Sequence, residues 1–579
     1  MPLRLCPHTP TTTLCTMSLH AMGDTAYLIT FEGAMNAAML ARVRALAARL
    51  EADRPAGVIE IVSAYASVAV IYEPERVAIQ PDELPWHAII EWIERHLAGK
   101  GASARPKAPR DHVIPVCYGG EYGPDLESVA KVVKLTPEAL IKLHAGATYT
   151  VAAIGFTPGF PYLLGLPEAL AVPRRGTPRV RVPAGSVGIG GAQTGIYPRE
   201  TPGGWQLIGR TGFELFDPLA EVPARLAPGD RVKFHAVDKF TPSRALPAGR
   251  ASGRGTVPAG VGSIEVLKPG TLTTVQDLGR RGAAGQGIGV GGALDRWAAM
   301  AANLAIGNPP EAALLECTYV GPVLRFSAAT TVAVLGAESP LLPAGRPLAI
   351  ESGAVLDCSS LTRGARLYLA VAGGLRVPLR LGAAATHLNA GFGGHEGRAL
   401  VEGDRVVYDA KARGLAAASW RIAAPVPPPA KKELIEVRLI PGPDWARLMR
   451  RSKADSSERA IEEMRFQLSA KSDRMGLRLG GDGFAVSSDT GEEVSRPVVP
   501  GTVQIPPDGH PIVLMAEGQT IGGYPQLGQI ASIDLPKLAQ ARPGAEIVFR
   551  ISSVSAAQHA RLRVADDLTR LRIGLQMRR

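Results

Sequence analysis

The sequence is poor in cysteine and in aromatic residues. Aromatic residues make up 5% of the chain, and the basic residues behind its net charge of +11 are dispersed. Nucleic-acid-binding proteins usually gather such charge on one face or interleave it with aromatic residues, so we expect no nucleic-acid partner. No two of the five cysteines form a CxxC pair, which predicts neither a disulfide framework nor a structural zinc site and favours a reducing, cytoplasmic location. The cysteines are Cys6, Cys15, Cys117, Cys317 and Cys358.

Long apolar segments are also absent. No stretch reaches the roughly 18 consecutive apolar residues that predict a membrane span, so we expect no membrane partner. The first 20 residues hold Cys, His, Pro and a Thr run but no apolar signal core. We interpret residues 1–20 as a disordered extension, with Met17 as an alternative start.

Several motifs of catalysis are missing as well. The chain has no GxxxxGK[ST] loop, HExxH, GxSxG or Met-Lys-Met sequence. These absences argue against a P-loop nucleotide site, a zinc protease, a nucleophile-elbow hydrolase and a biotin attached to this chain. We assign no metal ligands. A GxGxxG match at Gly287–Gly292 lacks a surrounding βαβ unit, so a generic anion site at the following helix N-terminus is the better interpretation. Asp295 would lie in that first turn, or simply stabilise the helix.

Glycine and proline are abundant, with 65 and 48 residues, and predict short strands joined by tight turns. We expect an α+β, mainly β protein. Strand-like and helix-like patterns between residues 21 and 118 follow the order βαββαβ of a small ferredoxin-like unit. Later segments alternate short apolar runs with Gly/Pro turns, as in closed or nearly closed β barrels.

These patterns divide the chain into segments, with Pro/Gly/Ala-rich breaks as linkers. The predicted segments are a disordered extension (1–20), a small α+β domain (21–110), a barrel (111–237), a linker (238–262), a first barrel of the second part (263–422), a linker (423–432), a second barrel (433–552) and a C-terminal tail (553–579).

Four short blocks recur in the same order and suggest that two of the barrels are related. Three of them are VPAGSVGI at 182–189 with VPGTVQI at 499–505, GGW at 203–205 with GGY at 522–524, and PGDRVKF at 228–234 with PGAEIVF at 543–549. The fourth pairs QTG at 193–195 with QTIG at 519–522. Turn sequences that resemble one another by chance are the alternative.

Glycine-rich loops with a few polar groups are the candidate binding elements of the first part. Glycines let the backbone approach a ligand closely, and aromatic residues supply apolar walls. Such loops suit a small, planar, polar ligand such as an amide, although each is also compatible with ordinary barrel turns. The candidate residues are Gly159, Gln193, Thr194, Trp205 and Arg210.

The second part offers three further polar clusters. Asp277 and Arg280 follow a predicted strand, and Asp473 and Arg474 place an acid beside a base. The loops PPDGHP and EGQTIGGYP flank the apolar run at 512–515. From these loops Asp508 could act as a general base or a metal ligand, with Gln519 and Tyr524 orienting a carbonyl. Asp in a Pro-Asp-Gly sequence is also a normal turn residue, and taken alone the motif favours that role.

Taken in order, these blocks resemble two known subunits fused end to end. The stretch GFTPGFPYLLGL, then PAGS, QTGIY and GGW, resembles the B subunit of 5-oxoprolinase, also called allophanate hydrolase subunit 1. The blocks TLTTVQDLG, GALD, VAGG and SDRMG, followed by GGYP, resemble the C subunit of the same enzyme. The resemblance spans about residues 20–550 and extends to the carboxyltransferase region of urea carboxylase. It implies cyclophilin-like barrels preceded by a small α+β domain.

The resemblance also implies ATP-driven hydrolysis of 5-oxoproline to glutamate with a separate 5-oxoprolinase A subunit, with Mg²⁺ held by either chain, and a homo-oligomer. Two residues depart from the family pattern, because Gly518 stands where an Arg is expected and Leu294 where a Met is. Two alternatives therefore stay open. One is a carboxyltransferase or allophanate/urea-type enzyme with a separate biotin carrier, and the other is a non-catalytic regulator of a histidine kinase.

Overall fold

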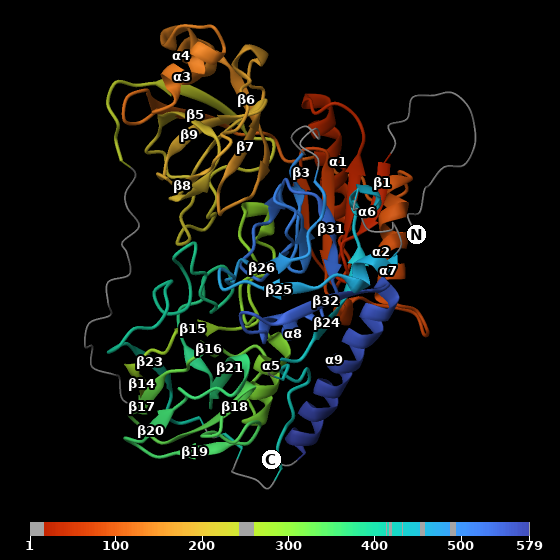
Figure 1. Cartoon of the computed structure of the whole chain (residues 1–579), viewed down its shortest axis with the longest axis vertical. Coiled ribbons are helices and arrows are strands. Elements are labelled where there is room, and N and C mark those ends of the chain that lie inside the picture. Colours follow the sequence, from red (N-terminus) through yellow and green to blue (C-terminus); the bar gives the residue numbers. More distant parts are fainter. Residues whose placement is uncertain are drawn as a thin grey trace.

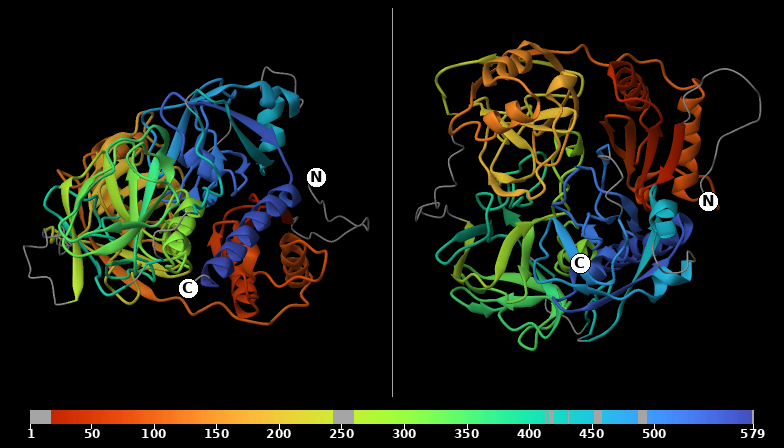
Figure 2. Two further views of the ribbon diagram at one scale, coloured as in Figure 1. Left: turned by 90° about the horizontal axis from the view of Figure 1, so that it is seen from below. Right: turned by 45° about the horizontal axis from the view of Figure 1, so that its top comes forward.

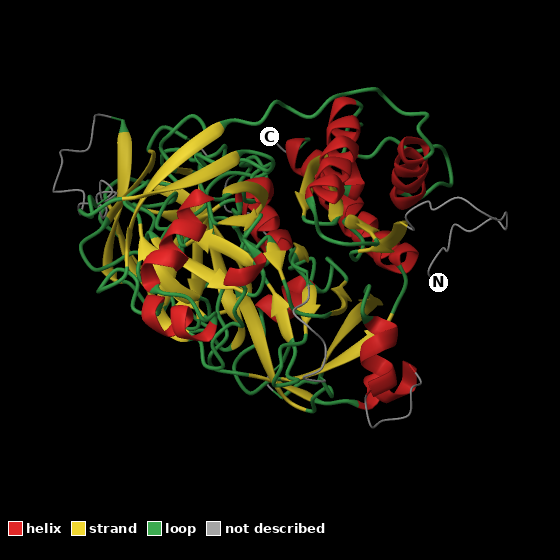
Figure 3. Cartoon of the chain, turned by 90° about the horizontal axis from the view of Figure 1, so that it is seen from above, coloured by secondary structure: helices red, strands yellow, loops and turns green. Residues whose placement is uncertain are grey.

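The computed structural model describes residues 17–242, 260–412, 414–415, 420–430, 432–451, 458–486 and 494–577. The chain forms four modules: an N-terminal α+β domain, a first closed barrel, a pair of β-sheets and a second closed barrel that ends in a long helix (Figure 1). Figure 3, coloured by secondary structure, shows its mainly β character. Of the helices within the described residues, none combines the length and apolar character needed to cross a bilayer.

The N-terminal domain is a four-stranded antiparallel sheet in the order β1-β2-β4-β3. Alternate residues of β2 serve its two faces: Tyr27 and Ile29 pack with the helices, whereas Leu28 packs toward the two barrels. The elements are β1 (Met17–Ala21), β2 (Ala26–Phe31), α1 (Ala37–Ala52), β3 (Val58–Ala64), β4 (Ser67–Tyr72), η1 (Pro74–Arg76) and α2 (Pro85–Leu97).

Two predictions for this domain are wrong. Residues 17–20, assigned to a disordered extension, belong to β1 (Met17–Ala21), which pairs along β2. The predicted sixth element of the βαββαβ unit is β5 (Asp111–Tyr118), which belongs to the first barrel because it pairs in parallel with β13 (Arg231–Ala236). The domain is therefore ββαββα rather than ferredoxin-like. Hydrophobic periodicity shows that a segment is a strand, but it does not show which sheet the strand joins.

The first barrel closes in the ring order β10-β7-β6-β13-β5-β12-β9. Its interior is filled by inward-facing side chains such as Val151, Leu163, Val187 and Ile189. Its remaining elements are α3 (Leu126–Val132), α4 (Pro137–Gly146), β6 (Thr148–Ile154), β7 (Pro161–Leu164), η2 (Glu168–Leu170), β8 (Arg179–Val182), β9 (Ser186–Gly190), β10 (Gln193–Ile196), β11 (Thr201–Gly203) and β12 (Gln206–Arg210).

The third module corrects the barrel predicted for residues 263–422. It consists of two five-stranded sheets, β20-β17-β14-β23-β22 and β15-β16-β21-β18-β19, that share one apolar core. Strand-and-turn patterns do not distinguish two packed sheets from one closed sheet. The elements are β14 (Val261–Lys268), β15 (Leu272–Gln276), η3 (Ala284–Gln286), α5 (Arg296–Ala305), β16 (Leu314–Thr318), β17 (Val323–Phe326), β18 (Thr330–Glu338), β19 (Leu348–Ile350), β20 (Val355–Asp357), β21 (Arg363–Val371), β22 (Leu375–Arg376) and β23 (Arg405–Asp409).

Most of the predicted linker at 238–262 lies outside the described residues, and β14 already begins at Val261. The second predicted linker, 423–432, forms no helix or strand where it is described. Val426 nevertheless packs into the core that α5 shares with the C-terminal helix.

The second barrel closes in the ring order β24-β31-β28-β29-β26-β25-β32. Its elements are β24 (Ile435–Pro441), α6 (Trp445–Arg451), α7 (Glu458–Glu463), β25 (Phe466–Leu468), β26 (Gly476–Gly481), β27 (Arg496–Pro497), β28 (Thr502–Gln504), β29 (Ile512–Leu514), β30 (Ile521–Gly522), β31 (Gln526–Ile530), α8 (Leu535–Ala539), β32 (Glu546–Ile551) and α9 (Val554–Gln576).

Helix α9 corrects the C-terminal tail predicted for residues 553–579. Ser553 begins it by accepting a hydrogen bond from the Ala556 N–H at 3.2 Å, which satisfies one free donor of the first turn. The helix lies on the outside of the molecule beside the N-terminal domain (Figure 2). There Gln558 donates to Tyr72 Oη at 2.9 Å, and Arg561 pairs with Glu75. The last element thus joins the first domain to the second barrel.

The two barrels have the same topology. Each ring places its strands in the same order, and each is closed by a parallel pair, β5 with β13 and β24 with β32. Each also carries a small two-stranded strap, β8 with β11 and β27 with β30. Three of the four repeated sequence blocks fall on equivalent strands. The exception is the QTG pair, because Gln193 lies in β10 whereas Gln519 lies in the loop before β30.

A matching buried ion pair supports the same relationship. In the first barrel Asp125 accepts from Arg179 at 2.7 Å and from the Leu207 N–H at 2.7 Å. In the second, Asp444 accepts from Arg496 and from the Gln526 N–H at 2.8 Å. Each carboxylate thereby joins the strap of its barrel to one barrel strand, and the two strands, β12 and β31, are equivalent in the two barrels.

Candidate functional site

A buried ion network joins the third module to the second barrel. We use this name for Glu316 of β16, Arg474 before β26 and Glu517 after β29. All three are at most 3% exposed. Arg474 donates from Nε to Glu517 Oε1 at 2.5 Å, from one terminal nitrogen to Glu316 and from the other to the Gly292 carbonyl at 2.6 Å. Arg366 Nε lies 3.9 Å from Glu316 Oε1, so two buried cations face the two buried carboxylates and compensate their charge.

Electrostatics keep this network charged. Burial disfavours the guanidinium cation, but Glu316 and Glu517 outweigh that effect and raise the pKa of Arg474. Glu316 Oε2 also accepts from the Tyr368 hydroxyl at 2.9 Å and from the Leu294 N–H at 2.9 Å. The network therefore links the start of helix α5 to the barrel loop that holds Glu517.

Glu517 also holds a glycine-rich loop of the third module. Its Oε2 atom accepts from the Leu388 N–H at 3.0 Å and lies 3.7 Å from His387 Nδ1. Burial and nearby Arg280 lower the pKa of His387 to about 3, so the imidazole is neutral near pH 7. The loop that follows reads GFGGHEG at 391–397. The ion network therefore positions this loop.

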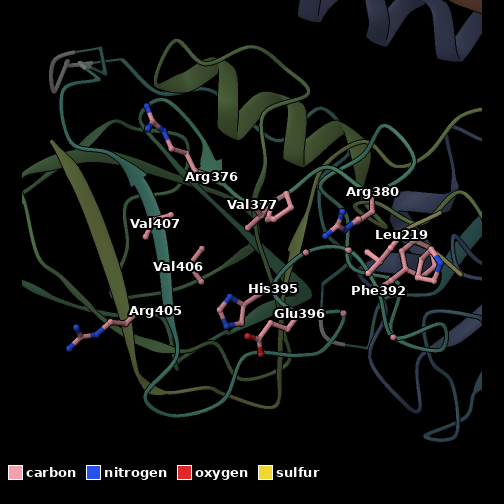
Figure 4. Close-up of a pocket in the computed structure, with 16 residues that line it drawn as sticks. Leu219, Arg376, Val377, Arg380, Phe392, His395, Glu396, Arg405, Val406 and Val407 are labelled. Atoms are coloured by element: carbon pink, nitrogen blue, oxygen red, sulfur yellow. The ribbon is translucent and has the colours of Figure 1, made fainter. Parts of the chain in front are cut away.

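The glycine-rich loop lines a cavity of about 420 Å³, which we call the loop cavity (Figure 4). Phe392 and His395 come from the loop, Arg380 from the preceding turn, and Leu219 from the first-barrel module. Figure 4 shows Arg380 beside Leu219 and Phe392, whereas Arg376 and Arg405 extend away from them. The cavity thus lies at the seam between the two parts of the chain, and its volume falls within the range of small-molecule sites.

A second polar cluster, on strands β28 and β31 of the second barrel, is buried: Gln504 is 2% and Gln526 1% exposed. Gln504 and Gln526 are paired in register and therefore share one face. Gln519 Nε2 donates to Gln504 Oε1 at 3.2 Å. Among the described residues, neither Gln504 Nε2 nor Gln526 Oε1 has a hydrogen-bond partner. A Cβ at Gly522 would lie only 2.4 Å from Gln504 Nε2, so the Gln504 amide packs directly against this glycine. We call these three glutamines the amide cluster.

The first barrel fills the equivalent position differently. Gly188 and Leu207 occupy the places of Gln504 and Gln526, and they are paired in register in the same way. Trp205 lies over Gly188, where an added Cβ would be 3.2 Å from the Trp205 Cβ. Trp205 is 5% exposed, whereas its counterpart Tyr524 is 42% exposed. The buried Trp205 side chain therefore covers this position in the first barrel, whereas the amides of Gln504 and Gln526 lie there in the second barrel.

Four of the residues predicted in the first part make contacts within packed cores and turns. Gln193 accepts from Tyr65 Oη at 2.9 Å and packs against the N-terminal domain. Trp205 belongs to a core that also contains residues of that domain and of the second barrel. Arg210 donates to the Ala184 carbonyl at 2.7 Å, and Gly159 donates its N–H to the Gln286 carbonyl at 3.0 Å. These four residues hold the modules and turns together.

Thr194 faces the interior of the first barrel, where it meets His144. His144 Nε2 lies 3.1 Å from Thr194 Oγ1, and Nδ1 lies 2.8 Å from the Tyr118 hydroxyl. Burial lowers the pKa of His144 to about 3. The imidazole is therefore neutral in the folded protein over the range in which it titrates when unfolded.

This burial predicts a pH-dependent loss of stability. Because the folded-state pKa lies below the unfolded value, only the unfolded chain gains a proton as the pH falls through about 6.5. Between about pH 7.5 and pH 5.5 His144 should lower the free energy of unfolding by about 1.4 kcal/mol. Denaturant titration should show that His144→Gln loses less stability over this range than the parent chain. An equal loss in both proteins would contradict the assignment.

Of the residues predicted in the second part, Arg474 and Arg280 lie close to the glycine-rich loop. Arg280 is 2% exposed, donates to the Ala385 carbonyl and lies over the Phe392 ring at 4.5 Å. Asp277 accepts from the Gly279 and Ala384 N–H groups and shapes the same turn. Asp473 is exposed and accepts from the Met475 N–H at 2.8 Å, as a turn residue does.

Asp295 is the N-cap of α5 and accepts from the Ala298 N–H at 3.0 Å. Gln540 donates to its other oxygen at 2.9 Å, and burial raises the pKa of Asp295 to about 6. Among the described residues its two oxygens are thus already engaged by protein donors. The helix-stabilising alternative for Asp295 accounts for this geometry better than the anion site does.

Asp508 lies in an exposed turn and accepts from the His510 N–H at 3.1 Å. It lies at one end of β29, and Gln519 follows the other end. The structure therefore places Gln193 and Trp205 in packed cores, and Asp508 and Tyr524 at the surface. The barrels meet through apolar packing of Phe160, Trp205, Val499 and Ile521.

Gly518 stands where an Arg was expected, and the local backbone is built around it. An added Cβ would lie 2.9 Å from the Met515 carbonyl oxygen and 3.0 Å from that of Met475. A larger side chain would require the backbone to shift. Arg474 supplies a cation to this loop through its bond to Glu517.

No metal site accompanies these residues in the described part of the chain, where three or more His, Cys, Asp or Glu side chains are nowhere gathered as ligands. The sequence interpretation overlooked Glu316, His387, Gln504 and the loop at 391–397. Two of these carried a signal: four glycines in seven residues at 391–397, and a Gln in VPGTVQI where the first copy has Gly.

Comparison with known proteins places both parts of the chain. Residues 17–226 match the carboxyltransferase domain, subdomain C and D, and residues 286–551 match the carboxyltransferase domain, subdomain A and B. The chain is 43% identical over 219 residues to the 5-oxoprolinase B subunit of Bacillus subtilis, covering 37% of this chain and 91% of that protein. It is 36% identical over 307 residues to the 5-oxoprolinase C subunit of Escherichia coli, covering 52% of this chain and 94% of that protein.

A solved structure matches the whole arrangement. The crystal structure of TTHA0988 superposes with a TM-score of 0.76 and 34% identity, covering 91% of this chain and 99% of that one. The order of the modules is therefore shared along nearly the full length of both chains. The chain belongs to the family of the 5-oxoprolinase B and C subunits, with the B-type part preceding the C-type part in a single polypeptide.

Proposed function

We propose that this chain acts with a separate A subunit as an ATP-dependent 5-oxoprolinase, which hydrolyses 5-oxo-L-proline to L-glutamate. The observation that carries the proposal is the presence of both parts in one chain, each matching nearly the full length of a 5-oxoprolinase subunit. The buried ion network, which joins two modules of the C-type part, and the loop cavity at the seam between the parts are consistent with a single working unit.

The chemistry explains why ATP is required. A lactam carbonyl is a weak electrophile, and its nitrogen is a poor leaving group. Transfer of the γ-phosphoryl group of ATP to the amide oxygen yields ADP and an activated, imidate-like carbon. Water adds to that carbon, the C–N bond breaks, and the nitrogen leaves as a protonated amine. A second water then cleaves the acyl phosphate, so that glutamate and phosphate are released.

The amide cluster supplies a match for the lactam. A cyclic amide presents its carbonyl oxygen and its N–H on the same side. Gln504 Nε2 is a donor and Gln526 Oε1 an acceptor, and both lack partners among the described residues. Hydrogen bonds of this kind hold and polarise an amide, and they exclude analogues that lack the N–H. We propose that Mg²⁺ enters as its complex with ATP, whose phosphate oxygens are ligands that Mg²⁺ prefers.

The proposal is tested by assaying phosphate release with the purified chain, the A subunit, ATP and 5-oxoproline. We expect release that depends on all four components and glutamate as the product. Carboxybiotin supplied without ATP should leave 5-oxoproline and urea uncarboxylated. Carboxyl transfer under those conditions, without 5-oxoproline-dependent phosphate release, would replace the proposal with a carboxyltransferase function.

A further inference from the structure

The glycine-rich loop at 391–397 has the backbone geometry of an anion-binding nest. Gly393, Gly394, Glu396 and Gly397 adopt φ values of +74°, +53°, +56° and +70°. Left-handed residues interspersed with right-handed ones turn successive N–H groups toward one concave side, where they attract anions. The N–H groups of Gly393, His395 and Glu396 have no hydrogen-bond partner within the described residues.

Cations without carboxylate partners surround this loop. Arg199, Arg280 and Arg380 form no ion pair with any carboxylate in the part of the chain that the structure describes. A Cβ at Gly391 would lie 3.7 Å from Arg199 Nη2, and one at Gly393 would lie 2.4 Å from Arg280 Nη2. Arg380 lines the loop cavity beside Leu219 and Phe392 (Figure 4). Such cations focus an electrostatic field that attracts an anionic ligand.

A buried histidine at the loop cavity also favours an anionic ligand. His395 lines the loop cavity and is 8% exposed, and its Nε2 atom has no hydrogen-bond partner among the described residues. Its closest ionic neighbour, Asp404 Oδ1, is 3.5 Å away and already accepts from Arg398 at 2.9 Å. A buried polar atom without a partner is costly unless a ligand or water satisfies it. Glu396, an acidic residue that lines the cavity, is paired with Arg398 at 2.9 Å and so does not oppose an anion.

We propose that the loop cavity binds a phosphate-bearing small molecule, with its phosphate oxygens on the nest N–H groups, His395 and Arg380. Leu219 and Phe392 supply apolar surface for a base beside that phosphate site. A nucleoside polyphosphate is therefore the class of ligand that fits. Its identification as ATP rests on the proposed function. Because Leu219 comes from the B-type part, the ligand contacts both parts of the chain.

The test is calorimetric titration of the purified full chain with ATP, pyrophosphate and adenosine, without the A subunit or 5-oxoproline. We expect ATP to bind, pyrophosphate to compete with it, and adenosine to bind at least tenfold more weakly than ATP. Arg380→Gln and His395→Leu should each weaken ATP binding by about tenfold or more, because each variant loses a hydrogen bond to the phosphate.

Arg325→Gln is the matched control, because Arg325 lies in the same module, pairs with Glu265 at 3.5 Å and does not line the cavity. It should bind ATP as the parent chain does. Unchanged ATP affinity in both test variants, or adenosine binding as tightly as ATP, would overturn the proposal. The binding assay contains no lactam, so its result is separable from failure of the 5-oxoprolinase assay.

Discussion

Arg474→Met is expected to lower the free energy of unfolding by about 3–5 kcal/mol, because it removes the cation that two buried carboxylates share and leaves Glu316 only the more distant Arg366, at 3.9 Å. Glu316 and Glu517 are 1% and 2% exposed, so solvent does not replace the lost guanidinium. The glycine-rich loop should loosen as well, since Glu517 accepts from the Leu388 N–H. Chemical denaturation measures the first effect, and hydrogen exchange of the Leu388 amide measures the second.

A surface pair provides the control for this variant. Arg550 and Glu436 pair across two strands of the same barrel, but their side chains are 37% and 53% exposed. Exposed pairs contribute about 0.2–1 kcal/mol, so Arg550→Met should cost no more than that. Combining Arg474→Met with Glu517→Gln removes one of the unpaired charges and should recover part of the loss. A loss below about 1 kcal/mol for Arg474→Met would show that the network is not the junction described above.

Gln504→Leu is expected to lower kcat/KM for 5-oxoproline by about 100-fold, with the chain still folded. The substitution removes the amide donor that is proposed to meet the lactam carbonyl. It also breaks the bond from Gln519, which at present orients Gln504. The assay is 5-oxoproline-dependent phosphate release with the A subunit present, and circular dichroism verifies the fold.

Gln467→Leu is the control for the amide cluster, because Gln467 is an exposed glutamine of β25 in the same barrel. Its activity should stay within about twofold of the parent chain, as expected for a surface substitution. If Gln504→Leu retained more than about a third of the parental kcat/KM, the amide cluster would have no part in substrate recognition.

Much of the architecture could be predicted from local patterns. The repeated VPAGSVGI and VPGTVQI blocks lie on equivalent strands of two barrels, because a glycine turn followed by inward-facing Val and Ile determines the same local fold twice. Pairing over long distances could not be predicted in this way. The partner of β5 is β13, about 120 residues away, and hydrophobic alternation in β5 contains no information about that partner.

The site was less predictable because its residues are brought together by the fold. Arg474 was selected for its neighbour Asp473, yet its partners are Glu316 and Glu517. Asp508 and Asp473 were predicted as catalytic residues. Each instead accepts a hydrogen bond from a backbone N–H of its own turn, as Asp often does in Pro-Asp-Gly and similar sequences. Glu316 lies in an apolar strand, where only a distant cation could compensate its charge.

The central claim is tested most directly by the stoichiometry of the complete reaction. With this chain, the A subunit, ATP and 5-oxoproline present, we expect glutamate and phosphate to appear in equal amounts and neither to appear when the chain is omitted. Glutamate formed without this chain, or phosphate released at the same rate without 5-oxoproline, would contradict the account.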